Sequence, residues 1–434
     1  MATYFGTDGI RGIYGEELSS LLVHKCGNSL ARLCTKRKVL IGRDTRQTGG
    51  LLTLSFASGL TAGGVDVVDV GIAPTPVIAF LTKKLGFDFG VVISASHNPP
   101  QYNGVKIYDE NGYKINEEVE KQIERKLFSP FLLSSNKVGS YTFDDKIIKE
   151  YKNSLLDFCQ SLEGLKIVVD CANGATAKLA KAVFSSLGGK IIYLNATCNG
   201  SRINDNCGAL YPGEMIKAVL QNGADMGVAF DGDGDRISAC DEKGNLLDGD
   251  DILYLLATYY PECHGVVGTS MTNKGLENLL AKKKIPFFRA DVGDKYVVEM
   301  MKNKSCTIGG EPSGHIVNFN LTTTGDGILT ALTLAQISIK NKKSLSKLAK
   351  LKKFPQINKN ISVVDKFRIL NSEKLSSEIL AISQAFGKDG RVLVRASGTE
   401  NKIRIMCEHK QKSTALSSAS RLESLVLEIN KINS

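Results

Sequence analysis

The chain has 434 residues, of which 42% are hydrophobic and 23% are charged, and its formal net charge is +10. At roughly 100–200 residues per domain, this length predicts two to four domains, and the apolar content excludes disorder as the dominant state. The most apolar runs, such as 65–70 and 89–93, are far shorter than the ~18–20 residues of a membrane helix, so a membrane span is excluded.

Short apolar runs alternate with longer helical patterns over most of the chain, which indicates an α/β fold with mainly parallel sheets. We expect strands at 39–42, 65–70, 89–93, 166–170, 190–194, 226–230, 266–269, 286–289 and 305–308. The first three accompany helical patterns around 18–35, 50–62 and 76–85. The C-terminal part differs, with strands expected near 361–364, 391–395 and 402–407 and helices near 372–386 and 413–431.

Similar segments recur at the ends of predicted strands, which indicates an internal repeat. The segment DFGVVI (88–93) resembles DMGVAF (225–230), and SCTIGG (305–310) leads into a comparable polar loop. Because ligands bind beyond the carboxyl ends of strands in open parallel sheets, the loops after these segments are candidate functional sites. The domains that we expect span 1–154, 155–250, 251–358 and 359–434.

The first of these loops is SASHNPP (94–100). A serine at the end of a buried strand is exposed and held by a short turn, which suits a nucleophile or a phosphate carrier. Ser96 is the candidate, followed by His97 and, ten residues on, by Lys106. From residue types alone, an ordinary serine-rich turn is the alternative, and the GxSxG pattern of a nucleophile elbow is absent.

The second loop, DGDGDR (231–236), carries three carboxylates separated by glycines: Asp231, Asp233 and Asp235. If they converge, each pair repels by ~1 kcal/mol at 4 Å even in water, so a hard divalent cation such as Mg²⁺ or Ca²⁺ is their natural counter-charge. An EF-hand requires glycine at the sixth position, where Arg236 stands, and a preceding helix rather than a strand. A plain acidic turn is the remaining alternative.

The third loop is GGEPSGH (309–315). Its carboxylate, hydroxyl and imidazole stand at alternate positions of a segment held extended by glycine and proline, namely Glu311, Ser313 and His315. This set can hydrogen-bond a polyol, although a simple Gly-Pro turn also explains the pattern.

A fourth loop, RASGTE (395–400), combines features of a phosphate-binding nest. Gly398 frees backbone N–H groups, and the polar side chains come from Arg395, Ser397, Thr399 and Arg404. Hydroxyls, exposed N–H groups and fork-shaped arginines together favour a phosphate dianion over a plain hairpin turn.

The N-terminal segment FGTDGIRG (5–12) has glycines at a spacing of three, with Arg11 among them, and is a weak signal by itself. No GxxxxGK[ST] pattern occurs, so nothing indicates ATP as a source of phosphate. A phosphorylatable serine, a metal loop, a polyol loop and a phosphate nest together suggest a reaction that recycles its own phosphoryl group.

Seven lysines and no acidic residue occur between Lys340 and Lys353, with leucines at 345, 348 and 351. The pattern favours an amphipathic helix with a solvated basic face. Nucleic-acid binding is the alternative, but no aromatic residue interleaves and no RNA-binding or zinc-finger signature appears, so we expect no nucleic-acid partner.

The ten cysteines form no CxxC pair, which favours small buried side chains in a reducing compartment over a zinc site or a disulfide framework. The first residues show no basic segment followed by an apolar run, so we expect no secretory signal. Both observations favour a cytoplasmic location and no membrane association.

The motifs at 5–12, 94–107, 231–236, 309–315 and 395–400 resemble, in order, those of the α-D-phosphohexomutase superfamily. Within it, FGTDGIRG and the segment INDNCG (203–208) are most similar to the bacterial phosphoglucosamine mutases. The chain departs from the family pattern at Asn401, where proline is common, at Pro312, where glutamine is frequent, and across 207–213. These departures remove no catalytic group, but they leave substrate preference open.

The resemblance implies three related α/β domains and a smaller C-terminal α+β domain around a central cleft. It also implies that Ser96 is carried as phosphoserine and, with the three aspartates, holds one Mg²⁺ per chain. General acid–base catalysis would involve Lys106, Arg11 and His315, with His97 and Arg236 supporting the phosphoserine site. Substrate binding would fall to Arg236, Glu311, Ser313, His315, Arg395, Ser397, Gly398, Thr399 and Arg404.

The reaction implied is the interconversion of glucosamine 6-phosphate and glucosamine 1-phosphate through a 1,6-bisphosphate. Glucosamine 1,6-bisphosphate or glucose 1,6-bisphosphate would be the activator, and the product would serve the synthesis of UDP-N-acetylglucosamine and cell-wall precursors. A phosphomannomutase or phosphoglucomutase with the same chemistry is the alternative. We expect a phosphosugar as the only partner and a monomer or homodimer.

Overall fold

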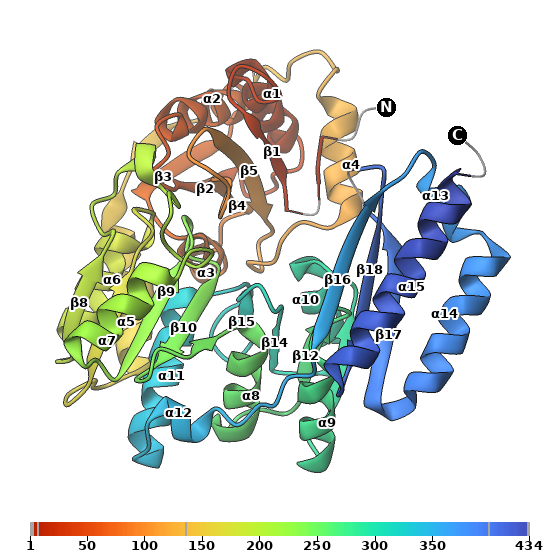
Figure 1. The fold of residues 1–434 in the computed structure, drawn as a ribbon. Helices are drawn as coiled ribbons and strands as arrows, with labels where there is room; N and C mark the ends of the chain where they lie inside the picture. Colours follow the sequence, from red (N-terminus) through yellow and green to blue (C-terminus); the bar gives the residue numbers. More distant parts are fainter. Residues whose placement is uncertain (1–3, 7, 135–136, 398–399, 432–434) are drawn as a thin grey trace. The chain divides into compact units, whose positions relative to one another are not determined.

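The computed structural model describes residues 4–6, 8–134, 137–397 and 400–431. The chain divides into two compact units, one made of 1–271 with 285–350 and the other of 272–284 with 351–434. The larger unit holds three sheets and the smaller unit holds one, and Figure 1 labels most of their strands and helices.

The first sheet of the larger unit has the strand order β1-β5-β4-β2-β3-β6. Its strands are β1 (Ile10–Ile13), β2 (Lys38–Arg43), β3 (Asp66–Ile72), β4 (Phe89–Ile93), β5 (Tyr102–Tyr108) and β6 (Tyr141–Phe143). Strands β2, β3, β4 and β6 pair in parallel, whereas β5 is antiparallel to both β4 and β1. The accompanying helices are α1 (Ser20–Ala31), α2 (Gly49–Ala62), α3 (Thr75–Leu85) and α4 (Glu117–Lys126).

Helices cover both faces of this first sheet. Successive residues of β2 point to opposite faces, and yet Val39, Leu40 and Ile41 are all buried. Helices α1 and α2 lie side by side (Figure 1), and two glycines permit their close approach. A Cβ atom on Gly27 would collide with the carbonyl group of Phe56, and one on Gly59 would collide with that of His24.

Two further α/β repeats complete the larger unit. The second sheet, of order β11-β10-β9-β7-β8, consists of β7 (Lys166–Asp170), β8 (Lys190–Leu194), β9 (Met226–Phe230), β10 (Ile237–Asp241) and β11 (Leu246–Leu247). The helices around it are η1 (Asp145–Ile147), α5 (Ile148–Phe158), α6 (Thr176–Ser186), η2 (Gly200–Arg202) and α7 (Gly213–Asn222). The third sheet, of order β13-β12-β14-β15, consists of β12 (Val266–Thr269), β13 (Phe287–Ala290), β14 (Ile308–Gly310) and β15 (Ile316–Asn318). Its helices are α8 (Gly249–Tyr259), α10 (Asp294–Lys304), α11 (Gly327–Asn341) and α12 (Leu345–Leu348).

The three repeats share one feature that positions the motif loops. In each, a strand paired in parallel with its inner neighbour turns back into an antiparallel strand, as in β4–β5, β9–β10 and β14–β15. The loops 94–100, 231–236 and 309–315 contain these three reversals. The equivalent placement explains why similar segments precede all three motifs.

The smaller unit is an antiparallel sheet of order β16-β18-β17 with helices packed on it. Its elements are α9 (Lys274–Lys282), β16 (Gln356–Ser362), α13 (Lys366–Leu370), α14 (Glu373–Phe386), η3 (Gly387–Asp389), β17 (Gly390–Ala396), β18 (Lys402–His409) and α15 (Lys412–Lys431). Apolar residues of α14, α15 and the sheet form its core, including Leu375, Ile405 and Leu422. The α/β class, with a smaller α+β part at the C-terminus, is confirmed.

The structure also corrects one expectation. The single amphipathic helix expected over 340–353 is wrong, because α11 ends at Asn341 and the next residue, Lys342, is left-handed. Between there and residue 353 the structure has only the short helix Leu345–Leu348. The ten cysteines all lie in the described part of the chain, where they are free thiols, and most are buried. Among the described residues, none of the helices combines the length and apolar character of a membrane span.

Candidate active site

The serine loop and the aspartate loop meet inside the larger unit. The hydroxyl of Ser96 donates a hydrogen bond to Oδ2 of Asp231 at 2.6 Å, and both side chains are buried. Ser96 has a φ of +52°, in the left-handed region that a serine rarely adopts. Its backbone N–H donates to Oγ of Ser94 at 2.8 Å, and that hydroxyl in turn donates to Asp44 at 2.6 Å. The turn after β4 therefore aims Ser96 at the acidic loop.

The three aspartates expected to bind a metal converge on one point. Each can offer a carboxylate oxygen within 4.8 Å of those of the other two, and all three are at most 1% exposed. Burial, followed by repulsion from Asp235 and Asp233, raises the pKa of Asp231 well above its usual range. Within the described chain, Oδ1 of Asp233 and Oδ1 of Asp235 are buried without a hydrogen-bond partner. These oxygen donors fit a hard divalent cation such as Mg²⁺.

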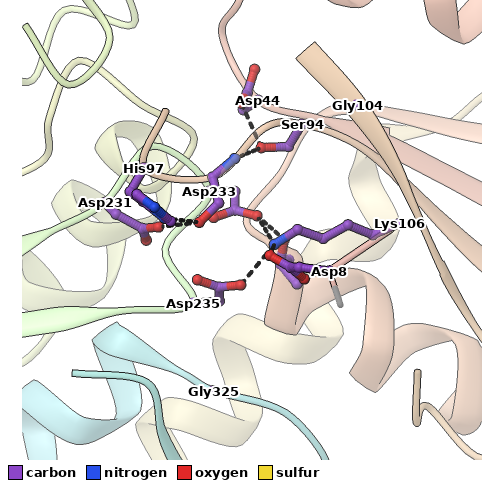
Figure 2. A network of polar contacts seen from close by, with 12 residues as sticks. Asp8, Asp44, Ser94, His97, Gly104, Lys106, Asp231, Asp233, Asp235 and Gly325 are labelled. Atoms are coloured by element: carbon purple, nitrogen blue, oxygen red, sulfur yellow. Dashed lines mark hydrogen bonds and ion pairs between the residues drawn. The ribbon is translucent and has the colours of Figure 1, made fainter. Parts of the chain in front are cut away.

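Lys106 lies against this aspartate triad, as Figure 2 shows. Its Nζ is 2.7 Å from Oδ2 of Asp233 and 2.8 Å from Oδ2 of Asp235, and the side chain is 1% exposed. Burial alone would lower the pKa of Lys106, but the two carboxylates outweigh it and raise the pKa above its ordinary value. The lysine is therefore a buried ammonium group, and its charge in turn holds the pKa of Asp235 well below the usual range despite burial.

Arg11 belongs to a second network of charges beside the triad. It pairs with Asp8, and its Nη1 donates to Oδ1 of Asn98 in the serine loop at 3.0 Å. Asp8 also contacts Lys114, which reaches Asp294 at the start of α10. Strand β1, the loop after β5 and the third repeat are thus joined by alternating charges.

Histidines flank the site from two loops. His97 Nδ1 is 3.4 Å from Ser96 Oγ, and burial, aided by Arg236 and Arg11, lowers the pKa of His97 to about 4. His97 is therefore neutral at physiological pH. Nε2 of His315 accepts a hydrogen bond from the backbone N–H of Gly325 at 3.0 Å, which assigns the ring proton to Nδ1. That Nδ1 lies 3.9 Å from Oδ1 of Asp235.

Two arginines in the larger unit have N–H groups suited to an anion. Arg236 is mostly buried, and its backbone N–H donates to Oδ1 of Asp231 at 3.1 Å. In the described part of the chain, the Nε atoms of Arg11 and Arg236 are buried and have no hydrogen-bond acceptor. Unsatisfied guanidinium donors beside a serine hydroxyl are a suitable environment for phosphoryl oxygens.

The third loop places its polar side chains close together in the β14–β15 reversal. Oε1 of Glu311 accepts from the backbone N–H of Gly293 at 3.1 Å, and Oε2 lies 3.5 Å from Oγ of Ser313. Glu311 is largely buried, so its carboxylate is held in place while Ser313 is more exposed. This loop, with His315, provides acceptors and donors for hydroxyl groups.

The fourth loop lies in the smaller unit. Arg395 of β17 and Arg404 of β18 stand opposite each other in the antiparallel register, and Nη2 of Arg404 donates to Oγ of Ser397 at 3.3 Å. Burial, followed by the charge of Arg404, lowers the pKa of Arg395. Two facing arginines repel each other, so an anion between them would be stabilised. Gly398 and Thr399, predicted for the same nest, lie outside the described residues.

Comparison with known proteins identifies the family. Models of the four phosphoglucomutase/phosphomannomutase domains (I, II, III and the C-terminal domain) match residues 2–131, 147–244, 248–354 and 338–423. A phosphoglucosamine mutase of Ruthia magnifica is 41% identical over 439 residues, which cover 98% of this chain and 100% of the relative. Another, of Clostridioides difficile, is 39% identical and covers 99% of both chains. The chain belongs to the phosphoglucosamine mutase family.

Solved structures agree on the fold. A phosphoglucomutase/phosphomannomutase family protein from Burkholderia thailandensis superimposes with a TM-score of 0.84 at 24% identity, covering 100% of this chain and 99% of that one. An N-acetylphosphoglucosamine mutase of Aspergillus fumigatus, solved with GlcNAc-6P and magnesium, gives a TM-score of 0.69 at 18% identity and covers 99% and 96%. The resemblance to α-D-phosphohexomutases is confirmed.

The sequence of this member of the phosphoglucosamine mutase family did not lead us to predict several residues that lie at the site. Thr75, at the start of α3, donates to Oδ2 of Asp233 at 2.7 Å. Arg46 is buried, pairs with Asp44 at 2.9 Å and donates to the carbonyl oxygens of Ser96, Asn98, Pro99 and Tyr102. The segment GRDTR (42–46) at the end of β2 was a usable signal, because charged residues at the carboxyl end of a parallel strand mark functional loops.

Proposed function

We propose that the protein interconverts glucosamine 6-phosphate and glucosamine 1-phosphate, with Ser96 carrying the phosphoryl group. One observation carries the proposal. The buried hydroxyl of Ser96 lies 2.6 Å from Asp231, within a convergent aspartate triad, in a chain 41% identical to a phosphoglucosamine mutase. A nucleophile, acidic metal ligands and unsatisfied arginines are the parts that phosphoryl transfer requires.

The reaction starts from phosphorylated Ser96. The Oγ–P bond breaks while phosphorus bonds to O1 of glucosamine 6-phosphate. The proton of that O1 hydroxyl passes to a base of the enzyme, and Ser96 Oγ takes up a proton from the enzyme to become a hydroxyl, which it gives up again in the second half. The sugar then carries phosphate at both positions. In the second half, the O6–P bond breaks, phosphorus bonds again to Ser96 Oγ, a proton returns to O6, and glucosamine 1-phosphate leaves. No phosphoryl donor is consumed overall, which agrees with the lack of an ATP-binding motif.

The aspartate triad and the buried arginines would stabilise the transferred phosphoryl group in different ways. Asp231, Asp233 and Asp235, with an oxygen on Ser96, would hold one Mg²⁺, which when bound neutralises charge on the transferring phosphoryl group. Arg11 and Arg236 offer N–H donors to phosphoryl oxygens as negative charge develops.

Proton transfer is assigned first to Lys106, with Arg11 close by. The ammonium group of Lys106 is buried beside two carboxylates and already carries its proton at Nζ, so it suits the step in which a proton is donated to an oxygen that loses its phosphoryl group. To act as the base, Lys106 would first have to release that proton. His315 is the weaker candidate, because its Nε2 already accepts a hydrogen bond from Gly325. His97, whose pKa is lowered to about 4, acts on Ser96 as a neutral hydrogen-bonding partner.

Substrate binding is divided between two loops. Glu311, Ser313 and His315 would bind sugar hydroxyls, because they present a carboxylate, a hydroxyl and an imidazole on one reversal of the chain. The phosphate that is not being transferred would be bound by Arg395, Ser397, Gly398, Thr399 and Arg404. Because the 1,6-bisphosphate must present each end in turn, this phosphate nest has to accept either phosphate.

Coupled assays with three substrates test the proposal. Glucosamine 6-phosphate should give the highest kcat/KM, ahead of glucose 6-phosphate and mannose 6-phosphate, with Mg²⁺ and glucose 1,6-bisphosphate or glucosamine 1,6-bisphosphate as activator. Ser96→Ala should be inactive, whereas Ser140→Ala, at an exposed serine outside the site, should match the wild type. A better kcat/KM for glucose or mannose phosphate would assign the enzyme to phosphoglucomutase/phosphomannomutase activity instead.

A further inference from the structure

The segment INDNCG (203–208) contributes no residue to the chemistry proposed above, although it reaches the serine loop. Asn204 lies in the second repeat, just beyond η2, and is 7% exposed. Its φ is +58°, a left-handed conformation that asparagine tolerates better than most residues. Its backbone N–H donates to the carbonyl of Ala172 at 3.0 Å, which ties it to the loop after β7.

The side chain of Asn204 crosses to the first repeat. Its Nδ2 donates to the carbonyl oxygen of Ser96 at 2.8 Å and to that of Asn98 at 3.0 Å. The same two carbonyls accept from Nη2 of Arg46, at 2.9 Å and 2.7 Å. Two buried donors, one from each repeat, therefore hold both ends of the turn that carries the nucleophile.

The aspartate loop packs against the same contact. A Cβ atom on Gly232 would lie 2.8 Å from the carbonyl oxygen of Ser96 and 2.9 Å from Nδ2 of Asn204. Gly232 separates Asp231 from Asp233, so the position of the acidic loop and that of the serine turn are set by one cluster of close contacts. Among the residues that the structure describes, Asn204 is the member of this cluster whose side chain donates from the second repeat to the serine turn.

We propose that Asn204 is a positioning residue, which holds the left-handed turn at Ser96 so that its Oγ stays aligned with Asp231. The inference rests on the proposed function, because it needs Ser96 to be the phosphoryl carrier. Without the two donated bonds, the carbonyl oxygens of Ser96 and Asn98 keep Arg46 as their side-chain donor from the first repeat and lose the one from the second, so the strained φ has less support. A displacement of about 1 Å at a reacting atom can lower a rate by about 100-fold.

The test compares two variants of Asn204 with a neighbour. Asn204→Gly removes the donors but allows the left-handed φ, so the chain folds. Asn204→Asp keeps the size and replaces the donor with a carboxylate that repels both carbonyls. The control is Asn206→Gly, because Asn206 is exposed, has a φ of +51° in the same loop and donates through its side chain to Asp205 rather than to the serine turn.

We expect kcat to fall by about 10–100-fold in both Asn204 variants, with KM within threefold. The melting temperature of Asn204→Gly should be close to that of Asn206→Gly, whereas Asn204→Asp should melt lower because its carboxylate is buried without a partner. Phosphorylation of Ser96 by glucose 1,6-bisphosphate, followed by intact mass, should slow by a similar factor. Hydrogen exchange of the amides at 94–98 should accelerate in both Asn204 variants and stay unchanged in Asn206→Gly. Arg46→Lys, which keeps the charge but loses the fork of donors, should lower kcat as well.

Two results separate the possible failures. If the wild-type enzyme interconverts the sugar phosphates while both Asn204 variants retain kcat within twofold, the positioning role is wrong and the proposed function stands. If the wild type neither turns over nor accepts phosphate on Ser96, the proposed function is wrong. Accelerated exchange at 94–98 in Asn204→Gly would still support the structural half of the inference in that case, and unchanged exchange would overturn it too.

Discussion

Replacing Lys106 with glutamine should make the stability of the protein depend on Mg²⁺. In the structure, Nζ of Lys106 lies 2.7 Å from Asp233 and 2.8 Å from Asp235, and all three side chains are at most 1% exposed. Removing one partner of a buried ion pair typically costs ~3–5 kcal/mol, because the remaining charge is left uncompensated. At ~2–4 °C per kcal/mol for large domains, the melting temperature of Lys106→Gln should fall by roughly 6–20 °C without metal.

Added Mg²⁺ should restore much of this loss. A ligand present at 100 times its Kd stabilises the folded state by about 2.7 kcal/mol. The variant should gain more from the ion than the wild type does, because Lys106 no longer occupies two of the three carboxylates. Thermal unfolding of both proteins in EDTA and in a series of Mg²⁺ concentrations measures the difference.

The matched control is Lys36→Gln. Lys36 pairs with Glu110 at 3.0 Å, but both side chains are about half exposed, and such surface pairs contribute ~0–1 kcal/mol. An equal response of Lys36→Gln and Lys106→Gln to EDTA and Mg²⁺ would refute the reasoning. So would a variant of Lys106 that melts like the wild type without metal.

Three further changes test other parts of the account. Burial raises the pKa of Asp326 to about 6, so the folded protein binds the carboxyl proton more tightly than the unfolded chain does. The resulting stabilisation of the folded state is complete below about pH 4 and is lost as the pH rises through 6. Between pH 4 and 7, the free energy of unfolding measured in urea should change by about 3 kcal/mol less in Asp326→Asn than in the wild type. Identical pH profiles of the two proteins would show that Asp326 has no such effect. Gly59→Ala should destabilise by about 1–3 kcal/mol because its Cβ meets the His24 carbonyl. Gly50 lies in the same helix, and a Cβ atom there would meet no neighbour within 4 Å, so Gly50→Ala should not destabilise the protein. Equal losses of stability in the two variants would contradict the packing argument. Arg404→Gln should raise KM for the sugar phosphate at least tenfold, corresponding to about 1.4 kcal/mol, while Arg421→Gln, at an exposed arginine that pairs with Glu378, should leave KM unchanged.

The sequence predicts the loops of the site better than their contacts. The strands β4 and β9 could be predicted because central parallel strands are continuously hydrophobic. Ser96 and Asp231 follow the carboxyl ends of these two strands, so both could be predicted as site residues. Strand β5 was not expected, because YNGVKIY alternates only weakly. It is this strand that brings Lys106 to the aspartates, so the ion pairs of Lys106 could not be predicted.

Contacts between repeats have no local signal either. Asn204 and Ser96 are 108 positions apart, and their hydrogen bond depends on how the second repeat packs against the first. The same holds for Lys114 and Asp294, which are 180 positions apart. Segment 272–284 groups with the C-terminal residues although β12 and β13 flank it in sequence, and no composition change marks that division. The domain boundaries near 155, 250 and 360 stay predictions.

Phosphorylation of Ser96 is the central claim, and intact mass measures it directly. Protein treated with phosphatase, freed of the phosphatase and then incubated with glucose 1,6-bisphosphate and Mg²⁺ should gain about 80 Da, the mass of one phosphoryl group. Peptide mapping should place this group on Ser96, and Ser96→Ala should gain nothing. A wild-type mass that does not change, or an equal gain in Ser96→Ala, would contradict the account.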